Sequence, residues 1–85
     1  ELLNMNVIEL ALIAQDHMNK NRIYAKGVSF AMKTLPKSYN GTKAELAMYL
    51  AERIERTIRN MSHDEDHELY YGQIALLNQM IKECL

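Results

Sequence analysis

The chain has 85 residues, 48% of them hydrophobic and 25% charged, a composition typical of folded domains and not of disordered segments. Its formal charge of −1 excludes a general electrostatic attraction to nucleic acid or to an anionic membrane. A chain of this length holds one hydrophobic core, so residues 1–85 are expected to form a single domain.

Hydrophobic residues recur at spacings of three and four along the chain, and no stretch keeps the alternating pattern of a β-strand. This periodicity predicts an all-α fold, either a compact four-helix bundle or a pair of helical hairpins. Pro36 cannot continue a helix, and residues 38–41 after it are expected to form a loop. The expected helices span about residues 3–18, 22–35, 43–60 and 63–84.

The first expected helix carries hydrophobic residues on two sides. Val7 and Leu10 lie on one side, whereas Met5, Ile8 and Leu12 lie on nearly the opposite side. One side is enough to cover a core. The second side therefore predicts either a central position in the bundle or a contact with another chain.

The second expected helix carries a basic face, on which Arg22, Lys26 and Lys33 fall within about 60° of one another, with Lys37 shortly after the helix. The interval 17–43 contains six basic residues and no acidic one. Such a face is the solvated side of an amphipathic helix, a contact for an acidic protein, or a phosphate-binding surface for nucleic acid. A protein that binds single-stranded nucleic acid needs aromatic residues between its basic residues, and none lies between the bases on this face.

Gly27 lies inside this helix, where a glycine costs about 1 kcal/mol relative to alanine. Close packing against a neighbouring helix is the preferred explanation for a glycine at this position. A hinge in the helix is the second explanation.

The third expected helix begins with a capping box. The Thr42 hydroxyl and the Glu45 carboxylate have the spacing that lets each satisfy a free backbone N–H at the helix start. Two pairs of opposite charge, four residues apart, are expected on or near the outside of this helix: Glu52 with Arg56, and Glu55 with Arg59.

The fourth expected helix begins with the same capping spacing, from Ser62 to Glu65. His63 and His67 nearby are four residues apart, which is a suitable spacing for two ligands of one metal ion. The sequence nominates no convincing third ligand. We therefore expect no metal site, and we assign the carboxylates of this segment to the positive end of the helix dipole.

The hydrophobic arc of the fourth helix spans about half of its circumference, wider than the arc of an ordinary surface helix. Leu69, Leu76 and Met80 form a second ridge beside the main one. Four short helices cannot place both the first and the fourth at the centre of one bundle. Either the first helix is central and the fourth helix only has a broad hydrophobic arc, or one of the second ridges contacts another chain.

Catalysis is not expected, because the sequence offers no nucleophile with a base and no glycine-rich phosphate loop. No cofactor is predicted either. No hydrophobic run approaches the ~20 residues that span a bilayer, so no membrane contact is expected. Cys84 is the only cysteine, which favours a reducing compartment and hence an intracellular protein, cytoplasmic or nuclear.

The sequence thus predicts a non-catalytic adaptor or regulatory module that contacts other proteins. It is expected to self-associate, as a homo-oligomer or in a larger assembly, or to bind a partner helix. The predicted contact residues are Leu69, Leu76 and Met80, together with Met5, Ile8 and Leu12. The alternative function is a nucleic-acid-binding regulatory domain that uses the basic face of Arg22, Lys26, Lys33 and Lys37.

Overall fold

The computed structural model describes residues 3–18, 24–62 and 64–85. Four helices pack into a small bundle, so the predicted all-α fold is confirmed. Two short strands accompany the helices. The elements in chain order are β1 (Leu3–Asn6), α1 (Val7–His17), α2 (Ala25–Thr34), β2 (Ser38–Gly41), α3 (Lys43–Asn60) and α4 (His67–Cys84).

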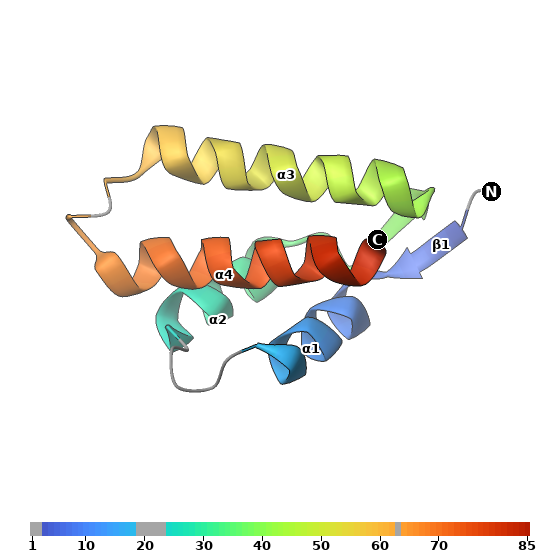
Figure 1. Ribbon diagram of the computed structural model, residues 1–85, viewed down its shortest axis with the longest axis horizontal. Helices are drawn as coiled ribbons and strands as arrows, with labels where there is room; N and C mark the ends of the chain where they lie inside the picture. The colour runs from blue at the N-terminus through green and yellow to red at the C-terminus, as the bar shows by residue number, and fades with distance from the viewer. Residues whose placement is uncertain (1–2, 19–23, 63) are drawn as a thin grey trace.

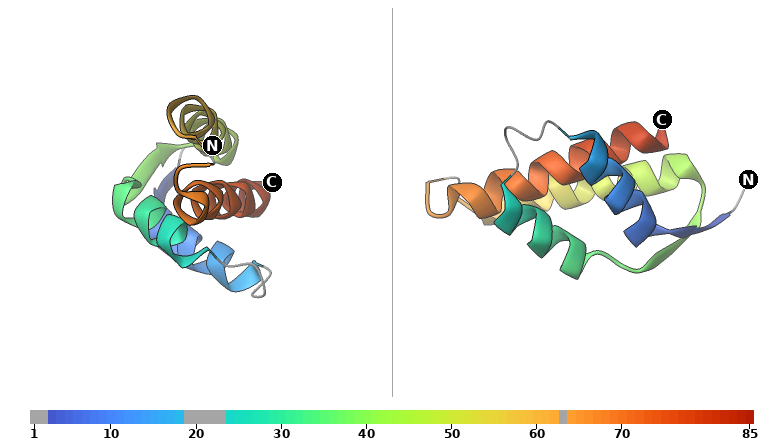
Figure 2. Two further views of the ribbon diagram at one scale, coloured as in Figure 1. Left: turned by 90° about the vertical axis from the view of Figure 1, so that its left-hand side faces the viewer. Right: turned by 90° about the horizontal axis from the view of Figure 1, so that it is seen from below.

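Helix α4 occupies the centre of the molecule. It runs antiparallel to α3, and α1 and α2 lie on its other side (Figures 1 and 2). Helix α4 packs against all three other helices, whereas α1 and α2 contact α4 much more than they contact each other. The wide hydrophobic arc of α4 is explained by this central position, because opposite sides of the helix face different neighbours. Of the two alternatives that the sequence left open, a central first helix is therefore wrong, because the fourth helix takes that position.

The core is built mainly from small or branched side chains of all four helices. Val7, Ala11 and Ala14 come from α1, and Val28 and Ala31 come from α2. The alanines let both short helices approach α4 closely. The remaining buried hydrophobic side chains are Leu35, Leu46, Ala47, Leu50, Leu76, Leu77, Met80 and Cys84.

The β1–β2 ribbon was not predicted. Its strands are antiparallel, with Met5 opposite Tyr39 and Asn6 opposite Ser38. The first helix therefore begins at Val7 and not near residue 3, because Asn6 caps it by accepting a hydrogen bond from Glu9 N–H at 3.0 Å. Residues 38–41, expected to form a loop, instead pair with residues 3–6, the segment that ends at this cap.

The predicted start of α3 is confirmed. Thr42 Oγ1 accepts from Glu45 N–H at 3.0 Å, and Glu45 Oε1 accepts from Thr42 N–H at 2.9 Å, which completes the capping box. Of the two predicted ion pairs on this helix, Glu55–Arg59 is present at 3.7 Å. The Glu52–Arg56 pair is not formed within the part of the chain that the structure describes.

The predicted start of α4 is wrong. Its N-cap is Asp66, whose Oδ1 accepts from Leu69 N–H at 3.1 Å, so the helix begins at His67. Ser62 Oγ accepts from Asp64 N–H at 3.3 Å instead of capping the helix. Asp66 is also anchored from α2 by an ion pair with Lys26, a tertiary contact that the local spacing of Ser62 and Glu65 does not reveal.

Candidate interaction surface

The ridge predicted on α4 is not a surface. Leu76 and Met80 have no exposed area, and Leu69 is half-buried. The prediction that Leu76 and Met80 form an exposed contact is therefore wrong, and the reason is the central position of α4. Both side chains pack in the hydrophobic core of the same molecule.

Two of the three residues of the second ridge predicted on the first helix lie on α1 in the structure. Met5 lies in β1, half-buried and packed against the core, so it does not share a helical face with the other two residues. Ile8 is half-buried on α1. Leu12, one turn later, is 53% exposed. Ile8 and Leu12 therefore remain candidates for a contact with another chain.

A groove of about 450 Å³ lies between α1 and α2. It exists because both helices pack on α4 and leave a space between their facing sides. From α1 it is lined by Ile8 and Gln15. From α2 it is lined by Ala25, Val28, Ser29, Met32 and Lys33. We call this surface, together with Leu12 beside it, the α1–α2 face.

The two edges of the α1–α2 face differ in charge. Lys33 lines the groove on the α2 side and is exposed. Helix α1 carries Glu9 and Asp16 on its solvent side, and both are exposed. Glu9 lies one helical turn before Leu12, and Asp16 lies one turn after it. One edge of this face is therefore basic and the other acidic.

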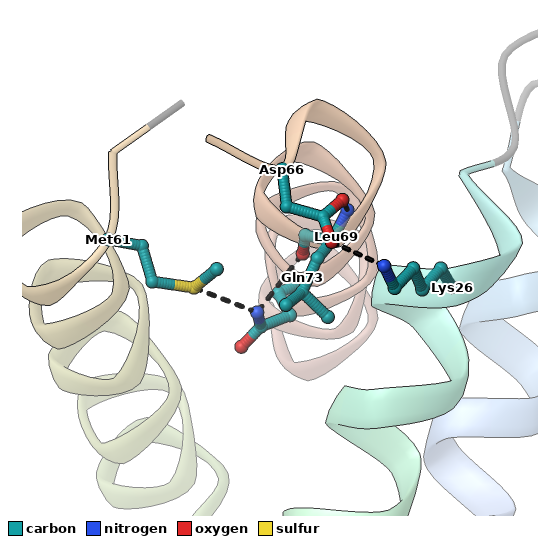
Figure 3. Close-up of polar contacts among 5 residues, drawn as sticks. All are labelled: Lys26, Met61, Asp66, Leu69 and Gln73. Atoms are coloured by element: carbon teal, nitrogen blue, oxygen red, sulfur yellow. Dashed lines mark hydrogen bonds and ion pairs between the residues drawn. The ribbon is translucent and has the colours of Figure 1, made fainter. Parts of the chain in front are cut away.

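The basic face predicted on the second helix is only partly available. Lys26 forms an ion pair with Asp66 (Figure 3). The hydrogen bond to Asp66 and its charge raise the pKa of Lys26, and the same hydrogen bond is the main cause that lowers the pKa of Asp66. Lys33 and Lys37 are exposed, and Arg22 lies outside the described residues. The structure thus assigns Lys26 a structural contact within the molecule.

The structure describes only one residue of the predicted histidine pair. His63 lies outside the described residues, and the ring of His67 packs edge-on against Tyr24 at a centroid distance of 5.6 Å. The ring of Tyr71 is 4.7 Å from that of His67. Among the described residues, no three side chains of the types that bind metals come together. His67 therefore belongs to an aromatic cluster that covers the start of α2.

Polar side-chain contacts join α4 to α1 and to the end of α3. His17, at the end of α1, lies 2.8 Å from Glu83 of α4. Inside the bundle, the buried Gln73 donates to Leu69 O at 3.0 Å and to Met61 Sδ at 3.3 Å (Figure 3). These contacts fix α4 relative to α1 and α3. Neither contact can be predicted from the sequence, because His17 and Glu83 are distant in the chain and a methionine sulfur is an unusual acceptor for a glutamine.

Comparison with family models, with curated proteins and with solved structures finds no match for this chain. Within residues 3–18, 24–62 and 64–85, none of the helices combines the length and the hydrophobicity needed to cross a bilayer.

Proposed function

We propose that this chain is a non-catalytic, intracellular interaction module of the adaptor or regulatory type that self-associates through its α1–α2 face. The observation that carries the proposal is the position of Leu12. This side chain is 53% exposed and lies on the same side of α1 as Ile8 and Gln15, which line an open hydrophobic groove. A protruding side chain beside a groove on one face is an arrangement that can complement itself.

Twofold symmetry supports a second copy as the occupant. In a twofold dimer the same patch meets itself, so that Leu12 of each copy reaches the groove of the other. Ile8, Val28 and Met32 would line the space that receives it. Burying one leucine fully contributes about 1.5–3 kcal/mol, and a twofold axis doubles each contact.

The charges at the two edges support the same pairing. A twofold axis that runs along α1 keeps the two α1 helices parallel and places the acidic edge of one copy, with Glu9 and Asp16, near the basic edge of the other, with Lys33. Complementary edges of this kind fix the register of an interface more than they raise its affinity. A partner of uniform charge would match only one edge.

The experiment is sedimentation equilibrium of the chain across about 1–500 μM, a range that covers weak to moderate dimers. The wild type should approach twice the monomer mass. Leu12→Gln should remain a monomer. Ile58→Gln is the matched control, because Ile58 is 54% exposed on α3, outside the α1–α2 face.

Two results would overturn the proposal. The first is a wild type that remains monomeric throughout this range. The α1–α2 face would then be a site for a helix of another protein. The second is an equal loss of association in Leu12→Gln and Ile58→Gln, which would indicate unspecific hydrophobic contact. The alternative prediction, binding of nucleic acid through the basic face of Arg22, Lys26, Lys33 and Lys37, is tested in parallel by retention of an oligonucleotide at low salt.

A further inference from the structure

A second hollow, of about 310 Å³, lies where β2 meets α3 and shares no residue with the α1–α2 face. Tyr39 lines it from β2. The other lining residues come from one face of α3, because Met48, Tyr49 and Glu52 lie three, four and seven residues after Glu45. The hollow therefore combines two aromatic rings, two carboxylates and a methionine, with no basic side chain among its lining residues.

The two rings are held in place without a ligand. The centroids of Tyr39 and Tyr49 are 5.8 Å apart, with their planes tilted by 35°. Both side chains are half-buried and pack against the core. Gly41 makes room for the first ring, since a Cβ at this position would lie 2.7 Å from Tyr39 Cε2. The aromatic surface is thus preformed.

One of the carboxylates is equally fixed. Glu45 uses Oε1 in the capping box with Thr42, which leaves Oε2 for another donor. Hydrogen bonding to Thr42 lowers the pKa of Glu45, so the group is ionised at neutral pH. Glu52 lies two turns further along α3 and is exposed, and within the described residues it forms no ion pair. Two negative charges therefore flank the aromatic rings.

Tyrosine faces together with carboxylates match an organic cation. The face of an aromatic ring attracts a cation that lies within about 6 Å of its centroid. A guanidinium group suits this site better than an ammonium group, because it is planar, stacks on aromatic rings and donates several hydrogen bonds to carboxylates. We propose that this hollow, the Tyr39–Tyr49 pocket, binds an arginine side chain of a partner protein, stacked on a tyrosine ring and hydrogen-bonded to Glu45 and Glu52.

The test is a titration of the ¹⁵N-labelled chain, followed by NMR, with a glycine–serine octapeptide that contains one arginine. The control peptide carries citrulline, which has the shape of arginine without its charge. Amide shifts are expected at Tyr39 and along residues 45–52 with the arginine peptide, and not with the citrulline peptide. Glu52→Gln should weaken binding about threefold, the size of one exposed ion pair.

Glu55→Gln is the matched control variant, since it removes the same charge one turn away, outside the pocket. It should bind the arginine peptide as the wild type does. The proposal is overturned if no shifts occur up to about 10 mM peptide, which would saturate even a millimolar site. Equal shifts with the citrulline peptide, or equal weakening by both variants, would also overturn it. Leu12→Gln leaves this pocket intact, so the result does not depend on self-association.

Discussion

Gly27 of α2 and Gly72 of α4 lie directly against each other, so that the backbones of the two helices are in contact. A Cβ on Gly27 would lie 2.6 Å from Gly72 Cα and also 2.6 Å from Gln73 N. A Cβ on Gly72 would lie 2.3 Å from Tyr24 O. Side chains cannot occupy these spaces, and the short α2 is held on α4 by this close approach.

Gly27→Ala should therefore destabilise the fold by about 3 kcal/mol, in spite of the higher helix propensity of alanine. The added methyl group would meet backbone atoms, and the two helices would have to move apart. Urea unfolding measures the change. Ser29→Ala on the exposed side of α2 is the control and should leave stability unchanged or slightly raised. A Gly27→Ala variant as stable as the wild type would contradict the close contact.

The same contact shows what the sequence could predict. Close packing is the explanation that the sequence favours for Gly27, and the contact with Gly72 confirms it. It could be predicted because a glycine inside a helix has few other uses. The Thr42–Glu45 capping box was predicted correctly for a similar reason. The capping box depends on two residues that are neighbours along one helix, where spacing alone determines geometry. Gly27 is a single residue, and its cost to its own helix indicates a close neighbour without indicating which one.

The misplaced features depend on residues that are distant in the chain. The width of the hydrophobic arc on α4 is visible in the sequence, but which helix becomes central is decided by packing, and Leu76 was therefore assigned to a surface. The pairing of Met5 with Tyr39 joins segments separated by two helices. The sequence does not indicate Asp66 as the N-cap, because its support from Lys26 is a tertiary contact. The Tyr39–Tyr49 pocket was missed because it requires the β1–β2 ribbon.

A cavity at Leu76 should reduce stability without affecting association. Leu76 has no exposed area, so Leu76→Ala should cost about 2–5 kcal/mol of unfolding free energy, measured in urea. The fraction that stays folded should show the same dependence of mass on concentration as the wild type. Loss of association in a folded Leu76→Ala variant would instead place this residue at an interface, against its burial in α4.

The start of α4 should depend on Asp66 and not on Ser62. Asp66→Ala removes both the N-cap and the ion pair with Lys26, so its unfolding midpoint should fall furthest. Asp66→Asn keeps an oxygen that can cap the helix and loses the ion pair, which predicts an intermediate loss. Ser62→Ala should change the midpoint little. A Ser62→Ala loss as large as that of Asp66→Ala would restore the cap predicted from the sequence.

The contact between His17 and Glu83 should make stability depend on pH. The hydrogen bond and the charge of Glu83 raise the pKa of His17, with a smaller contribution from Asp16, while the hydrogen bond from His17 lowers the pKa of Glu83. A raised histidine pKa stabilises the fold when the ring is protonated, below the unfolded value of about 6.5. This contribution is lost as the pH rises through the pKa of the folded state. The lowered pKa of Glu83 has the opposite sign, and its contribution is lost only in acid.

The difference in unfolding free energy between the wild type and His17→Gln should therefore be largest near pH 5.5, where His17 is charged and Glu83 is ionised, and should shrink toward about pH 8.5. Urea unfolding at a series of pH values measures this difference. Glu83→Gln is the matched variant on the α4 side and should remove the same pH dependence. A difference that stays constant, or that grows with pH, would show that the protonated ring does not hold α1 on α4.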